Sequence, residues 1–123
     1  MAARRKLLLV DDDEAVIEFL GLKLGAEFDI VSTMLPEKAL ELAREHRPDL
    51  VLCDIDIPDM DGGDISAALF ADAQTHAIPV VFLTALVSPQ DLAAKGNQLA
   101  GRAAVSKDSP IDEIRARIVA ALQ

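Results

Sequence analysis

The sequence has one cysteine, an excess of acidic over basic residues and no long hydrophobic run. Cys53 has no second cysteine with which to form an internal disulfide, and its place in the run LVLC predicts a small buried residue. Cysteine and histidine do not cluster in the sequence, which disfavours a zinc or iron site.

The charge balance narrows the kinds of partner. Twelve Lys and Arg residues against 21 Asp and Glu residues give a formal net charge of -9, which disfavours direct contact with nucleic acid or an anionic membrane. The apolar run LLLV near the start is too short for a signal peptide or a membrane span. We therefore expect a cytoplasmic protein whose partners are proteins or cations, with residues 1–123 forming a single domain.

Five short apolar runs alternate with segments of helical spacing. Because the runs are continuous and do not alternate with polar residues, each predicts a strand that is covered on both faces. Alternation of strands with helices predicts right-handed crossovers in a parallel sheet, and therefore a doubly wound α/β domain. The predicted strands are residues 6–11, 28–33, 49–54, 78–84 and 102–107.

Two prolines mark the predicted starts of helices, and one predicted helix has an interrupted pattern. Pro36 and Pro110 suit the first turns of the second and fifth helices, where a missing backbone N–H costs nothing. The fourth helix, around residues 88–100, is the weakest because Gly96 and Asn97 interrupt its pattern. We expect that helix to be short or broken.

Every central strand of the predicted sheet ends in a polar residue. In an open parallel sheet, ligands bind at the carboxyl ends of the strands. Carboxylate and backbone oxygens there suit Mg²⁺, and a carboxylate beside such an ion becomes a nucleophile toward phosphorus. A hydroxyl and a lysine at the same edge would stabilise the transferring phosphoryl group, so the pattern fits phosphoryl transfer to Asp54. The residues at these strand ends are Asp11 and Asp12, Asp54, Thr84 and Lys107.

Four motifs carry a resemblance to a known family. In order along the chain they are LLLVDDD, RPDLVLCDIDIPDMDGG, IPVVFLTA and VSK. Over essentially its whole length the chain resembles the receiver domain of two-component response regulators. The resemblance implies a flavodoxin-like doubly wound sandwich, with five helices around a five-stranded parallel sheet of order 2-1-3-4-5.

The resemblance also implies roles for the site residues. Asp54 would accept a phosphoryl group from the histidine of a sensor histidine kinase or phosphotransfer protein. Mg²⁺ would be held by Asp12, Asp54 and the backbone carbonyl of Asp56, while Asp11 would bind the ion mainly through water. The residues that match the family's phosphoryl-binding hydroxyl and lysine are Thr84 and Lys107.

The family's output surface departs from its usual pattern here. Ala104 stands where receivers usually carry an aromatic residue that rotates with the threonine, and alanine has no rotamer to switch. We therefore hypothesise that reordering of the fourth helix carries the output signal instead. The receiver of that signal would be a downstream protein target or an effector domain. The face formed by the fifth strand and helices four and five is where the family commonly docks or forms homodimers. In the family, the positions of Asp56 and Leu86 tune loss of the phosphoryl group to water, and we expect Asp56 to accelerate it.

Two other interpretations compete with a phosphorylated receiver. Asp54 and Asp56 form a D-x-D pair similar to the nucleophile loop of haloacid dehalogenase-type phosphatases, but those enzymes place the pair after the first strand, and Asp11 and Asp12 have no role in them. A receiver-like scaffold that is never phosphorylated is disfavoured by retention of all five site residues, although Ala104 leaves it open. We predict a signalling receiver that promotes only its own phosphorylation and slow hydrolysis.

Several other polar residues are assigned structural roles. Asp13 and Glu14 suit the N-cap and first turn of the first helix. We expect neither histidine, His46 or His76, to take part in catalysis. The acids around Pro58, Gly62 and Gly63 are predicted to form turns and cap a helix, namely Asp59, Asp61 and Asp64.

Overall fold

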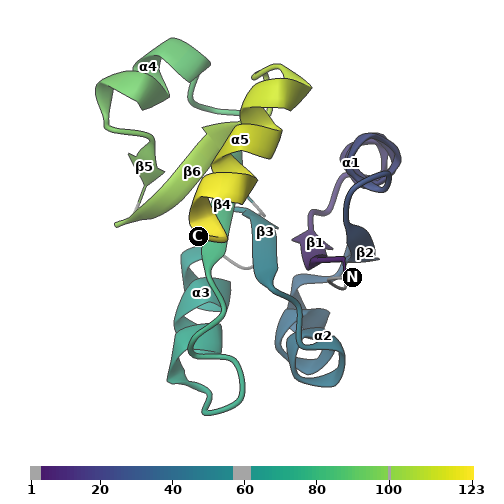
Figure 1. Cartoon of the computed structure of the whole chain (residues 1–123). Coiled ribbons are helices and arrows are strands. Elements are labelled where there is room, and N and C mark those ends of the chain that lie inside the picture. The colour runs from purple at the N-terminus through teal and green to yellow at the C-terminus, as the bar shows by residue number, and fades with distance from the viewer. Residues whose placement is uncertain (1–3, 57–61, 100) are drawn as a thin grey trace.

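The computed structural model describes residues 4–56, 62–99 and 101–123 (Figure 1). Strands and helices alternate over most of the chain, as the apolar runs predicted. In order, the elements are β1 (Lys6–Val10), α1 (Glu14–Leu24), β2 (Asp29–Thr33), the 3₁₀ helix η1 (Pro36–Lys38), α2 (Ala39–His46), β3 (Leu50–Asp54), α3 (Gly62–Ala71), β4 (Val80–Thr84), α4 (Pro89–Ala94), β5 (Gln98–Leu99), β6 (Arg102–Ser106) and α5 (Ile111–Ala121).

The strands form one sheet in the order β2-β1-β3-β4-β6-β5. The pairs from β2 to β6 are all parallel, which confirms the predicted doubly wound sheet and its strand order. The prediction of five strands was incomplete, because β5 adds a two-residue antiparallel strand at the edge beside β6. The predicted fifth strand is therefore β6.

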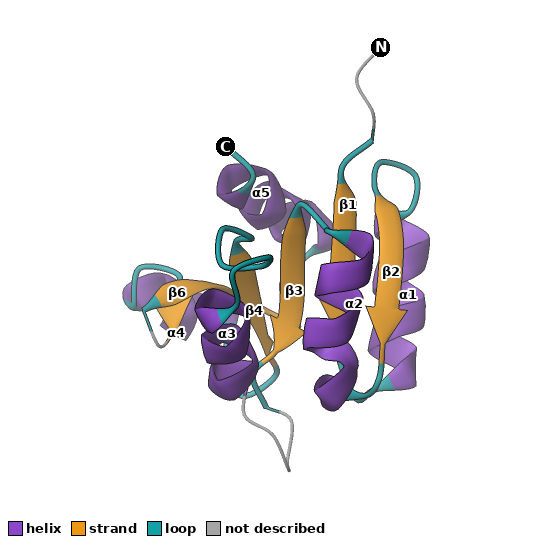
Figure 2. Cartoon of the chain, turned by 90° about the horizontal axis from the view of Figure 1, so that it is seen from below, coloured by secondary structure: helices purple, strands orange, loops and turns teal. Residues whose placement is uncertain are grey.

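Alternate residues of the central strands form two separate cores. One core joins Leu8, Val51 and Phe82 to side chains of α2, α3 and α4, while the other joins neighbouring strand residues such as Leu7 and Leu52 to α1 and α5. Figure 2 shows α2 and α3 in front of the strands and α1 behind them. Strands covered on both faces have apolar residues at every position, which explains the continuous runs in the sequence.

The helix ends agree with most of the sequence signals. Asp13 is the N-cap of α1, where its carboxylate accepts a hydrogen bond from the amide of Ala15. Pro36 begins η1, which leads directly into α2, instead of beginning α2 itself. Pro110 is the N-cap of α5 and lies one residue before its predicted first-turn position.

The predicted helix at residues 88–100 is much shorter in the structure. α4 begins after its N-cap Ser88 and ends at Ala94. Gly96 and Asn97 then have φ angles of 74° and 57°, in the left-handed region that stops a right-handed helix. The chain turns there into the hairpin of β5 and β6, and the amide of Ala104 donates to the carbonyl of Asn97.

The parallel strands bring their carboxyl ends to one edge of the sheet. Backbone hydrogen bonds continue past these ends, from the amide of Ile55 to the carbonyl of Leu83 and from the amide of Lys107 to the carbonyl of Thr84. The residues that follow β3 and β6 are thus tied to the end of β4. No helix in the described part of the chain is long and apolar enough to cross a membrane.

Candidate functional site

Three carboxylates meet at the carboxyl ends of β1 and β3. Asp11 and Asp12 follow β1 and Asp54 is the last residue of β3, and one oxygen from each lies within 4.8 Å of the other two. Asp11 and Asp54 are 1% and 2% exposed, whereas Asp12 is exposed. Crowded buried carboxylates repel one another unless a cation compensates them, so the cluster requires positive charge nearby.

Lys107 supplies a positive charge from the end of β6. Its Nζ lies 2.7 Å from an oxygen of Asp11 and 3.2 Å from an oxygen of Asp54. Its side chain is only 16% exposed, so water screens both ion pairs weakly. The structure therefore brings together four of the predicted site residues, Asp11, Asp12, Asp54 and Lys107.

Burial and charge set the protonation of this cluster. Burial raises the pKa of Asp54 to about 6, and the charge of Asp11 adds to the rise, while the amide of Asp56 and the ammonium of Lys107 oppose it. Burial acts to lower the pKa of Lys107, but its hydrogen bonds and ion pairs with Asp11 and Asp54 outweigh burial and raise it. At neutral pH, Asp54 is thus mainly a carboxylate and Lys107 is an ammonium.

Thr84 lies at the end of β4 and is hydrogen-bonded to Asp56. Its Oγ1 donates to the Asp56 carboxylate, with Oγ1 to oxygen distances of 3.1 and 3.3 Å. The amide of Ala85 donates to the same carboxylate at 2.9 Å. The amide of Asp56 itself donates to Asp54 at 2.8 Å, which links this second group to the acidic cluster.

The donor set fits a hard cation. Asp11, Asp12 and Asp54 offer only carboxylate oxygens, which Mg²⁺ prefers, and the described residues include no Cys or His in the cluster. The side chain of Asp56 bonds to Thr84 and Ala85 instead of joining the cluster. The predicted use of its backbone carbonyl as a metal ligand stays a prediction.

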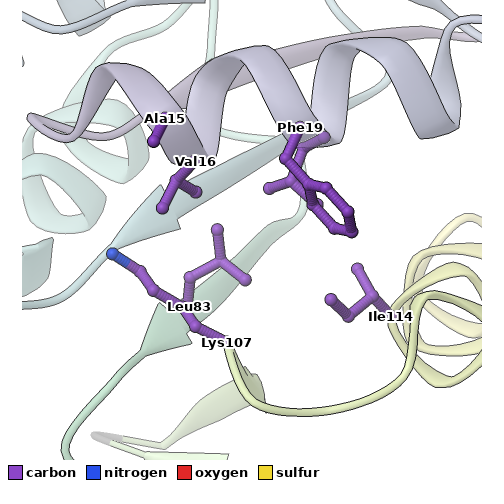
Figure 3. Close-up of a pocket in the computed structure, with 7 residues that line it drawn as sticks. Ala15, Val16, Phe19, Leu83, Lys107 and Ile114 are labelled. Atoms are coloured by element: carbon purple, nitrogen blue, oxygen red, sulfur yellow. The ribbon is translucent and has the colours of Figure 1, made fainter.

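An apolar pocket of about 180 Å³ adjoins Lys107. Figure 3 shows Ala15, Val16 and Phe19 of α1 on one side of it and Leu83 and Ile114 on the other. The ammonium nitrogen of Lys107 points away from Phe19 and Ile114 in this view. The pocket therefore lies between α1 and α5, beside the charged cluster.

The remaining predicted residues lie outside this arrangement. Cys53 is buried in the core, as predicted, and His76 is exposed with its ring bonded to the carbonyl of Ala73. His46 is the last residue of α2, and Asp64 is exposed in the first turn of α3. The predictions for Pro58, Asp59 and Asp61 lie outside the described residues.

Sequence reasoning missed one part of the site, the bonds from Thr84 and Ala85 to Asp56. Ala85 contributes only its backbone amide, and a backbone donor leaves no side-chain signal in a sequence. The sequence signal for Asp56 was its place two residues after Asp54, which does not reveal the direction of its side chain.

Comparison with known sequences finds a family model and several relatives that match this chain. Residues 7–119 match the family model described as the response regulator receiver domain. The chain is similar to the response regulator PleD of Caulobacter vibrioides, with 37% identity over 93% of the chain and 24% of that protein. It is also similar to the DNA-binding response regulator MtrA of Mycolicibacterium smegmatis, with 40% identity over 72% of the chain and 38% of that protein. The chain thus spans well under half the length of these relatives.

Solved structures give the same fold. A putative response regulator from Chloroflexus aurantiacus superimposes with a TM-score of 0.81 and 28% identity, covering 98% of each chain. The chemotaxis protein CheY4 of Vibrio cholerae also gives a TM-score of 0.81, over 97% of this chain and 99% of that one, at 22% identity. These matches confirm the predicted flavodoxin-like arrangement.

Proposed function

Because this chain belongs to the family of response regulator receiver domains, we propose that Asp54 accepts a phosphoryl group from a histidine kinase or phosphotransfer protein. The observation that best supports the proposal is the position of Asp54, a buried carboxylate facing a lysine and two further acids at the carboxyl edge of the sheet. Receiver domains are generally not enzymes acting on an external substrate, and we propose only self-phosphorylation and slow hydrolysis for this one.

The proposed reaction is a single displacement at phosphorus. A carboxylate oxygen of Asp54 attacks the phosphorus of a phosphohistidine, a P–O bond forms and the P–N bond breaks. The histidine nitrogen keeps the electron pair of the broken bond. A pKa of about 6 leaves Asp54 mainly ionised at neutral pH, which supports its use as the nucleophile.

Asp12 and Asp54 are the residues that would hold Mg²⁺ directly, with Asp11 acting mainly through water and the carbonyl of Asp56 as a further ligand. When bound, Mg²⁺ would neutralise the carboxylates and the incoming phosphoryl oxygens. Three carboxylates around one lysine leave net negative charge at the site, which favours a divalent cation.

Thr84 and Lys107 would stabilise the phosphoryl group. Lys107 already contacts Asp54, so its ammonium can pair with a phosphoryl oxygen by a small movement. The hydroxyl of Thr84 and the amide of Ala85 are neighbouring donors at the end of β4. Together these groups supply the electrostatic stabilisation that phosphoryl transfer depends on.

The proposed partners are proteins. A donor must bring its phosphohistidine to Asp54, and the half-exposed Phe19 on the rim of the neighbouring pocket offers apolar contact area. We propose that the face of α4, β6 and α5 contacts a downstream protein or effector domain, or forms a homodimer. The net charge of -9 supports protein contacts and no direct nucleic-acid or membrane contact, and we place the domain in the cytoplasm.

Intact mass after incubation with acetyl phosphate and Mg²⁺ tests the proposal. We expect the wild type to gain one phosphoryl group, and neither Asp54→Ala nor wild type without Mg²⁺ to gain any. Asp64→Ala is the matched control, because Asp64 is an exposed aspartate of α3, and it should be phosphorylated like the wild type. If the folded wild type gains no mass, the proposal is wrong and a receiver-like scaffold that is never phosphorylated becomes the better hypothesis.

A further inference from the structure

Asp56 holds an unusual position for an acid beside a site that binds an anion. Its carboxylate accepts hydrogen bonds from the hydroxyl of Thr84 at 3.1 Å and from the amide of Ala85 at 2.9 Å. The Thr84 side chain is buried, whereas Asp56 is half-buried. Two donors thus converge on one negative group at the end of β4.

We propose that Thr84 and Ala85 form an anion seat, and that Asp56 occupies this seat as an internal competitor of the phosphoryl group. The inference rests on the proposed phosphorylation of Asp54 and adds a regulator of the same site. Asp56 is a positioning residue, because it acts through the Thr84 hydroxyl and the Ala85 amide and not on the reacting phosphorus.

The number of protons at the seat makes the competition direct. A threonine hydroxyl has one proton and a backbone amide has one. The oxygen of Thr84 already accepts a hydrogen bond from the amide of Leu86 at 3.1 Å, which orients the hydroxyl so that its proton is directed at Asp56. A phosphoryl oxygen that takes either donor must therefore displace the Asp56 carboxylate from it.

The backbone keeps Asp56 close to the seat. Its amide donates to Asp54 at 2.8 Å, and the neighbouring amide of Ile55 donates to the carbonyl of Leu83. These bonds tie the chain around Asp56 to both β3 and β4. The competing carboxylate is therefore present at high effective concentration and needs only a side-chain rotation to leave or return.

Removing the competitor should strengthen binding of a phosphoryl mimic. Two hydrogen bonds at the low end of their usual net contribution correspond to about a fivefold change in affinity. We expect Asp56→Ala to bind beryllium trifluoride, with Mg²⁺ present, about fivefold more tightly than the wild type. Asp56→Asn keeps a carbonyl acceptor for the two donors but loses the charge, so its affinity should lie between the two.

Asp108 provides the control for simple charge repulsion. It is an exposed aspartate directly after Lys107, and no described contact joins its side chain to Thr84 or Ala85. Asp108→Asn removes one negative charge near the site and should change the affinity for the mimic less than twofold. If charge alone mattered, Asp56→Asn and Asp56→Ala would gain affinity equally.

The experiment combines two measurements on folded protein. The first is the amide chemical shift of Ala85 without ligands, which should move in Asp56→Ala and stay unchanged in Asp108→Asn. The second is a titration of each variant with beryllium trifluoride and Mg²⁺.

Equal affinity of the wild type and Asp56→Ala for the mimic would overturn the inference and leave the proposed function intact, and so would an unmoved Ala85 shift. Binding by Asp56→Ala alone would support the inference most strongly. If no variant bound the mimic and the wild type gained no phosphoryl group from acetyl phosphate, both proposals would be wrong.

Discussion

Lys107 offers the sharpest test of the electrostatic argument. Its ammonium contacts both Asp11 and Asp54, which are almost fully buried. Lys107→Met keeps most of the apolar stem that lines the pocket but removes the charge, so two buried carboxylates lose their cation. Breaking a buried ion pair by removing one partner typically costs 3–5 kcal/mol.

Two factors limit the loss of stability. The site lies at the edge of the sheet, and a carboxylate that has lost its cation can take up a proton. Protonating Asp54, whose pKa is about 6, costs only about 1.4 kcal/mol at pH 7 and nothing at pH 5, where the group is already mainly protonated. We therefore expect Lys107→Met to lower the free energy of unfolding by about 2 kcal/mol at pH 7 and by less than half as much at pH 5. The loss shrinks at low pH because a protonated carboxyl no longer needs the lysine.

Urea unfolding at the two pH values measures both losses. With a slope near 2 kcal/mol per molar, a loss of about 2 kcal/mol lowers the midpoint by about 1 M. Mg²⁺ should stabilise the variant more than the wild type, because it replaces the missing cation. Lys95→Met is the control, since Lys95 is exposed and has no ion pair among the described residues, and it should change stability by less than about 0.5 kcal/mol. Equal losses at pH 7 and pH 5 would refute the reasoning.

Three further predictions concern the metal, the phosphoryl group and α4. Because the pKa of Asp54 is about 6, protons compete with Mg²⁺ for its carboxylate. The Kd for Mg²⁺, measured by calorimetry, should therefore be about tenfold higher at pH 5 than at pH 7. An unchanged Kd would contradict the assignment of Asp54 as a ligand. Asp56→Ala should lose its phosphoryl group more slowly than the wild type by time-resolved intact mass, and an equal or faster loss would show that Asp56 does not accelerate hydrolysis. Backbone relaxation of Pro89–Ala94 should change on addition of a phosphoryl mimic, and unchanged relaxation and chemical shifts would remove α4 from the switch.

Most of the fold could be predicted because its signals are local. Continuous apolar runs identify β1, β3 and β4, shorter apolar segments mark β2 and β6, and parallel connectivity places Asp11, Asp54 and Lys107 at one edge. The hairpin of β5 and β6 escaped prediction because it depends on a left-handed Asn97, and asparagine usually adopts other conformations. The bonds from Thr84 and Ala85 to Asp56 escaped because they depend on side-chain direction and a backbone amide.

The structure also suggests how Thr84 can influence α4 without an aromatic residue on β6. Ala104 is fully buried opposite Phe82 and belongs to the same core as Leu92 of α4, so no side chain at that position can rotate outward. The oxygen of Thr84, however, accepts from the amide of Leu86, two residues before Ser88, the N-cap of α4. If a phosphoryl group draws the Thr84 hydroxyl away from Asp56, the rotation alters that bond at the start of the segment leading into α4. The short β4–α4 connection therefore offers a backbone route to α4 that needs no rotating side chain at Ala104.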